Sequence, residues 1–150
     1  MQAKLIQLSR QQIQRHSYIF VIFAVAIFSA ALIGIFTRPL AYSAFFWPAN
    51  PVFLGLLIRF PRMRTASALW GAFSGYMIAD LLTGNGLALA FILTMTNFVA
   101  VLSTVSILVY IQNQFKYFKD GPQVIYPYIF ALILGTLIGS TFAVNTIPYV

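Results

Sequence analysis

Side chains able to carry out chemistry are scarce in this chain of 150 residues. The acids are Asp80 and Asp120, the one histidine is His16, and cysteine is absent. Thiolate nucleophiles, thiolate metal sites and disulfides are therefore excluded. No nucleophile–base pair or cluster of metal ligands occurs, and Gly84-Asn85-Gly86 is typical of a turn rather than a phosphate-binding loop. We predict no catalytic residue, no metal and no cofactor.

Asp80 is the most informative polar residue, because it lies inside an apolar stretch that is expected to cross a membrane. It stands about fifteen residues into the stretch 65–82, roughly 22 Å from its start by helical rise. A carboxyl group at such a depth is costly, and intramembrane acids often mark functional sites. The structural alternative is that Asp80 reaches water at the outer interface or pairs with Arg38. Both interpretations stay open at this point.

The segment Trp47-Pro48-Ala49-Asn50-Pro51 is the second candidate, and we expect it near the middle of the apolar stretch 39–58. Its two prolines remove two backbone donors and leave carbonyl groups unpaired. Lipid tolerates such groups only when they are buried in protein or line a cavity. Asn50 offers a donor and an acceptor, which repair the break or hold a polar ligand. A kinked helix repaired by its neighbours is the alternative.

Asn97 adds another amide in the following apolar stretch, where hydrogen bonding between helices is the favoured role. The candidate residues for binding a ligand or signal are therefore Trp47, Asn50, Asp80 and Asn97.

The elements that must position these residues are transmembrane helices. Hydrophobic residues make up 61% of the chain and charged residues 7%, against roughly 25% charged in soluble domains. A stretch of about 20 apolar residues suffices to cross the hydrocarbon core as a helix. We predict an all-α, polytopic bundle with a basic cytoplasmic head at 1–17 and a transmembrane domain at 18–147. Its five spans are expected at about 18–37, 39–58, 65–82, 87–111 and 124–145.

Basic residues fix the expected orientation. Alternate gaps between the spans hold eight of them, and Arg38 stands alone on the other side; the eight are Lys4, Arg10, Arg15, Arg59, Arg62, Arg64, Lys116 and Lys119. This positive-inside pattern predicts a cytoplasmic N-terminus, an outer C-terminus and a location in the inner membrane. The basic residues behind the net charge of +7 are then expected to interact with anionic lipid headgroups, and we expect no binding of nucleic acid.

Small residues recur at a spacing of four in two of the predicted helices. The first set is Ser67, Gly71, Gly75 and Ala79, and the second is Ala131, Gly135, Gly139 and Ala143. Such ladders let helix backbones approach closely. We expect Gly71, Gly75, Gly135 and Gly139 to be packing residues, within the monomer or across a homodimer.

Four markers in order resemble the bacterial membrane-associated sensor (MASE-type) domain. They are the segments 45–51 (FFWPANP), 55–61 (GLLIRFP), 70–73 (WGAF) and 84–86 (GNG). The resemblance covers roughly residues 40–111. It implies an input module attached to a cytoplasmic output domain, often a GGDEF diguanylate cyclase and sometimes a phosphodiesterase or histidine kinase. The chain departs from the family in carrying Asn50-Pro51 where a glycine is usual and five spans instead of about eight.

Three functions follow from these observations. The preferred one is a non-catalytic sensory module, linked by the resemblance to cyclic di-GMP signalling, whose output domain lies beyond the expected five spans. The second is a small transport or substrate-capture subunit, and the third is a structural anchor that oligomerises. The expected partners are the lipid bilayer, an unidentified small ligand, and a second copy or another membrane subunit.

Overall fold

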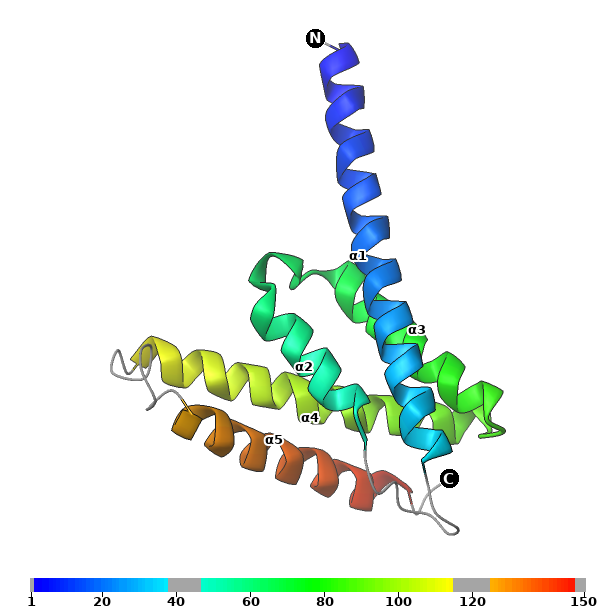
Figure 1. Cartoon of the computed structure of the whole chain (residues 1–150), viewed down its shortest axis with the longest axis vertical. Coiled ribbons are helices and arrows are strands. Elements are labelled where there is room, and N and C mark those ends of the chain that lie inside the picture. The colour runs from blue at the N-terminus through cyan, green and yellow to red at the C-terminus, as the bar shows by residue number, and fades with distance from the viewer. Residues whose placement is uncertain (1, 38–46, 115–124, 148–150) are drawn as a thin grey trace.

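The computed structural model describes residues 2–37, 47–114 and 125–147, with side chains described for 10–37, 47–113 and 125–147. All regular structure in these ranges is helical (Figure 1). The elements are α1 (Gln2–Phe36), α2 (Ala49–Arg59), the short 3-10 helix η1 (Pro61–Met63), α3 (Ala66–Leu82), α4 (Leu87–Gln114) and α5 (Ile125–Thr146). The all-α class predicted from the sequence is confirmed.

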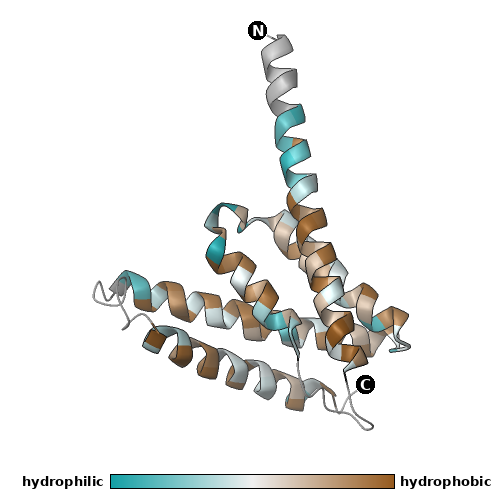
Figure 2. Cartoon of the chain, viewed as in Figure 1, coloured by the Kyte–Doolittle hydropathy of each residue, from teal (hydrophilic) through white to brown (hydrophobic). Residues whose placement is uncertain are grey.

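The basic head and the first predicted span form one continuous helix. α1 runs for 35 residues without a break at the expected boundary near residue 17. Figure 2 shows the change in character along it, from a hydrophilic portion to a strongly hydrophobic one. Gln, Arg and Lys are good helix formers and no glycine or proline interrupts residues 2–33, so the chain has no local reason to stop the helix.

Three helical segments are long and apolar enough to cross a membrane, namely Arg10–Phe36, Leu87–Asn113 and Ile125–Thr146. This indicates a membrane protein. α3 has 17 residues and α2 has 11. Eleven residues rise about 16 Å, which is well short of the roughly 30 Å hydrocarbon core.

The later part of the second expected span, 39–58, contains α2. Its helix begins at Ala49, and the earlier part of the expected span, including residues 39–46, lies outside the described residues. Pro48 occupies the N-cap position and Pro51 the first turn, where a backbone N–H has no helical partner in any case. The two prolines therefore stand at the start of α2, where their missing N–H groups leave no hydrogen bond of that helix unmade.

α1 and α3 run parallel and touch backbone to backbone. A Cβ added to Gly71 would collide with the carbonyl oxygen of Phe20, and one added to Gly75 would lie 2.7 Å from the carbonyl oxygen of Ala24. The contacts follow the same order along both helices, because His16 Nδ1 in the middle of α1 also lies 3.1 Å from Ser67 Oγ at the beginning of α3. The absence of side chains at these two glycines sets the distance between the helices.

α4 and α5 form a second, antiparallel pair. A Cβ at Gly135 would collide with Thr104 Oγ1, while a Cβ at Gly139 would lie 2.6 Å from the Cβ of Ala100. Residue numbers therefore increase along α5 as the numbers of the residues they contact on α4 decrease, so the two helices are antiparallel. In Figure 1 this pair crosses the α1/α3 pair instead of running alongside it.

α2 joins the two pairs, since it contacts both α1 and α4. Its Phe53 is completely buried and meets Phe23 of α1, Tyr76 of α3 and Phe98 of α4, with ring centroids 6.2, 6.3 and 5.2 Å away. Edge-to-face and tilted aromatic pairs of this kind stabilise beyond the area that they bury. One aromatic side chain thus ties three helices around α2.

We expect Gly75→Ala to lower the stability of the protein by about 1–3 kcal/mol, because the new methyl group meets rigid backbone atoms of α1. Thermal unfolding in detergent measures this change. Gly55→Ala is the matched control, since a Cβ there meets nothing within 4 Å, and it should be neutral or stabilising. Equal melting temperatures for both variants would contradict the assigned contact.

Candidate functional site

A hydrogen-bonded trio surrounds the start of α2. The Tyr76 hydroxyl donates to Asn50 Oδ1 at 2.7 Å, and Trp47 Nε1 donates to the same oxygen at 3.3 Å. An indole nitrogen donates and never accepts, so its partner must be the amide oxygen. This requirement fixes which way the Asn50 amide is turned, and the amide nitrogen faces away from both donors.

Trp47 is held from a second direction by α1. Its ring lies against Gly34, where an added Cβ would be 2.9 Å from Cζ3. Tyr76 itself is completely buried in α3, one residue after the contact glycine Gly75. The trio therefore connects α1, α2 and α3, and the orientation of Asn50 depends on all three.

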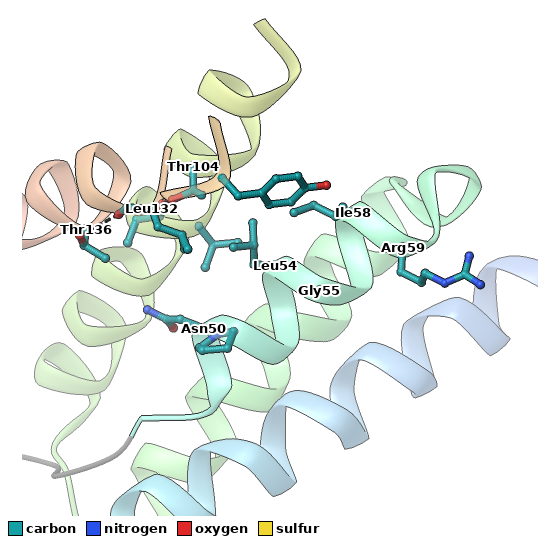
Figure 3. A pocket seen from close by; sticks show the side chains of 12 residues that line it. Asn50, Leu54, Gly55, Ile58, Arg59, Thr104, Leu132 and Thr136 are labelled. Atoms are coloured by element: carbon teal, nitrogen blue, oxygen red, sulfur yellow. Dashed lines mark hydrogen bonds between the residues drawn. The ribbon is translucent and has the colours of Figure 1, made fainter. Parts of the chain in front are cut away.

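A cavity of about 440 Å³ opens on the other side of Asn50, between α2, α4 and α5. Its walls are largely apolar; they are formed by Asn50, Pro51, Leu54, Gly55, Ile58 and Arg59 of α2, Ala100, Val101 and Thr104 of α4, and Tyr128, Leu132 and Thr136 of α5. Figure 3 shows the Asn50 amide pointing from α2 toward the α4 and α5 side, while Arg59 points away from the other labelled side chains. The volume is within the range of about 300–1,000 Å³ typical of small-molecule sites.

Asn50 supplies an uncommitted polar donor to this cavity. No described residue accepts a hydrogen bond from Asn50 Nδ2. The threonine protons are committed elsewhere, because Thr104 donates to the carbonyl of Ala100 and Thr136 to that of Leu132, each at 2.8 Å. A mostly apolar pocket with a few placed polar groups is the usual form of a ligand site.

Asp80 belongs to a different contact. Its side chain is 2% exposed and accepts a hydrogen bond of 2.9 Å from Asn85 Nδ2, in the turn that follows α3. This bond braces the α3–α4 connection, in which Gly84 adopts a φ of 96°. The predicted partner Arg38 lies outside the described residues. Asp80 follows Tyr76 by one helical turn but does not line the cavity.

Asn97 stands apart from the other candidates. It is half-buried on α4, and no hydrogen bond joins it to Asn50 or Asp80 within the described part of the chain. The structure thus brings Trp47 and Asn50 together, links Asp80 to Asn85, and leaves Asn97 separate. Among the described residues, no group of three histidine or carboxylate side chains is placed to hold a metal ion.

Tyr76 and Gly55 are the residues that sequence reasoning missed. Tyr76 sits four residues before Asp80, so the two share a face of α3, and that spacing was the available signal. Gly55 interrupts α2 in its interior and is exposed, which marks open space beside it. Neither residue reveals its partner without knowledge of which helix faces meet.

Basic groups gather where the middle of α1 meets the turn before α3. Arg15 Nη2 donates to the carbonyl of Arg62 at 3.2 Å, which attaches η1 to α1. Arg64 Nε donates to the carbonyl of Leu57 at 2.7 Å, which attaches the same turn to the end of α2. Both guanidinium groups therefore stabilise the conformation of this turn.

We expect Tyr76→Phe to destabilise the protein by about 0.5–1.5 kcal/mol, because it removes the hydroxyl that donates to Asn50. In an Asn50→Ala background the same change should cost less, since the bond is already absent. Thermal unfolding of the two single variants and the double variant gives the coupling. Strictly additive losses would show that the two side chains do not interact.

Comparison with known proteins assigns no family to the chain. No protein-family model, no curated protein and no solved structure matches it. The resemblance to MASE-type domains therefore rests on the sequence markers alone, and the function has to be argued from the geometry of α2 and its cavity.

Proposed function

We propose that the chain is a non-catalytic sensory module of the bacterial inner membrane, in which a ligand between α2, α4 and α5 changes the packing of α2. The observation that carries this proposal is the division of α2 into two faces. One face buries Phe53 and Leu57 in the core, and the other lines a cavity of about 440 Å³. A ligand there has differential contacts with two positions of α2, which is the condition for shifting a conformational equilibrium.

A route from the cavity to the basic end of the bundle supports the proposal. α2 ends at Arg59 and passes directly into η1, which is attached to α1 through Arg15. A displacement of α2 along or around its axis therefore moves η1 against α1. In the proposed orientation this end lies in the cytoplasm, where an output domain or partner protein receives the change.

The charge pattern supports this orientation and a multi-pass topology. In Figure 2 the hydrophilic portion of α1 extends away from the bundle, and at its lower end Arg15 contacts Arg62 in the hydrophilic turn at η1. Two of the basic segments used to assign a cytoplasmic side thus adjoin in space, as the positive-inside rule requires. We propose five segments embedded in the membrane, with α2 and α3 packed against the longer helices α1 and α4. By resemblance, the output is cyclic di-GMP signalling.

A substrate-capture subunit of a transporter is the second candidate, and the outer face of α5 favours it. Outward-facing Ile129, Ile133 and Leu137 are exposed by 48, 54 and 57%. This apolar face suits lipid, a second copy of the chain or a translocating subunit. A capture subunit holds its ligand in the same cavity but needs no movement of η1.

Filling the cavity by mutation separates the two candidates without an identified ligand. Gly55→Leu places a side chain in open space and should mimic the occupied state. Spin labels on Gln12→Cys and Arg62→Cys report the spacing of α1 and η1, and the chain contains no native cysteine to interfere. For a sensor we expect the distance distribution to shift by about 1–2 Å, the scale of helix shifts in switching proteins.

Gly86→Leu is the control for this measurement. Its added Cβ also meets nothing within 4 Å, but the residue lies outside the cavity, so the distribution should match that of the parent. An unchanged distribution in Gly55→Leu protein with native stability would reject the sensory proposal in favour of passive capture.

A further inference from the structure

We propose that the cavity between α2, α4 and α5 binds an uncharged, elongated apolar molecule bearing a carbonyl group, whose oxygen accepts a hydrogen bond from Asn50 Nδ2. This inference rests on the proposed function in taking the cavity as the ligand site. It adds the chemical class of the ligand and the residue that recognises it.

The shape of the cavity selects an elongated molecule. Its α2 residues occupy one face from Asn50 to Ile58, a span of about 12 Å by helical rise. Its α5 residues Tyr128, Leu132 and Thr136 repeat every four positions over the same length. The space is therefore a channel between nearly continuous helix faces, which fits a chain better than a compact ring system.

Gly55 extends this channel to the backbone of α2. Glycine inside a helix is less favourable than alanine, so its presence calls for a compensating reason. The close contacts that explain Gly71 and Gly135 are absent here, because a Cβ at Gly55 meets nothing within 4 Å. The missing side chain instead leaves room in the channel.

The Asn50 amide favours a ligand that carries a hydrogen-bond acceptor at one end. Trp47 and Tyr76 occupy the Asn50 oxygen, so the group presented to the cavity is a donor. An apolar environment without competing water makes an unmet donor costly and a matched acceptor favourable. A carbonyl oxygen meets this requirement without bringing a proton that needs its own partner.

The charged side chains around the cavity favour a neutral ligand. Among the residues that the structure describes, no acidic side chain lines the cavity, and the one cationic side chain that does, Arg59, is directed away from the other labelled residues (Figure 3). The Arg59 guanidinium carbon instead lies 5.5 Å from the centroid of the Phe60 ring. An anionic ligand would have to draw this group from water into the channel, at a large desolvation cost.

Trp47 provides a built-in reporter for the test. The chain has two tryptophans, Trp47 and the exposed Trp70, so Trp70→Phe leaves one indole bonded to Asn50. The full chain with this change is placed in lipid nanodiscs, and its Trp47 fluorescence is followed during titration with undecane, 2-undecanone and undecanoate. The concentration of each probe is expressed as a mole ratio to lipid. The first two probes differ by a carbonyl group, and the third adds a negative charge.

We expect 2-undecanone to bind about tenfold more tightly than undecane, as one hydrogen bond to a desolvated donor allows. Undecanoate should bind more weakly than the ketone. Asn50→Asp at pH 8 keeps an oxygen for Trp47 and Tyr76 but lacks the amide donor, so the preference for ketone over alkane should disappear. Gly55→Leu should abolish saturable binding of all three probes, whereas Gly86→Leu should retain it.

Equal affinities for ketone and alkane would overturn the recognition by Asn50, and tighter binding of undecanoate would overturn the requirement for a neutral ligand. Saturable binding that survives in a stably folded Gly55→Leu protein would overturn the location. Failure of the sensory proposal is distinguishable, because the ketone would then bind as expected while the spacing between labels at positions 12 and 62 stays constant.

Discussion

Contact between helix backbones is the constraint on which the remaining structure depends. In lipid, apolar side chains gain little by leaving one hydrocarbon environment for another, so helices associate through close packing and hydrogen bonds. Gly71 and Gly75 provide that packing between α1 and α3, and Gly135 and Gly139 provide it between α4 and α5. The two pairs are dense for this reason, and the looser space between them is left to α2 and the cavity.

Much of this arrangement is readable from the chain. The glycine spacing identifies the faces of α3 and α5 that meet a neighbour, and the apolar stretches locate α3, α4 and α5 to within a few residues. Which helices pair is not readable, because a small-residue face accepts any complementary partner. The cavity is harder still, since it depends on the alignment of three helix faces from distant parts of the chain.

The place of Pro48 and Pro51 in α2 shows why prolines in an apolar stretch are hard to interpret. Prolines in an apolar stretch are compatible with a kink in a long helix and with the start of a short one. Pro48 and Pro51 fit the start, where proline has a favourable φ and its missing N–H costs nothing. If the two prolines kinked a long helix, they would leave carbonyl groups unpaired, which is what the sequence led us to expect. The polar feature is instead an amide turned by Trp47 and Tyr76, which places a donor where the prolines suggested an acceptor.

The unbroken course of α1 has a mechanical consequence. A helix of 35 residues is about 52 Å long, and its hydrophilic portion continues from the apolar one without a joint. A tilt of α1 about its glycine-lined contact with α3 would therefore move the two ends of the helix in opposite directions. A small tilt of the hydrophobic portion would displace the hydrophilic portion sideways, by an amount that grows with distance from the contact. A modest rearrangement inside the bundle would then become a lateral displacement at the N-terminal end.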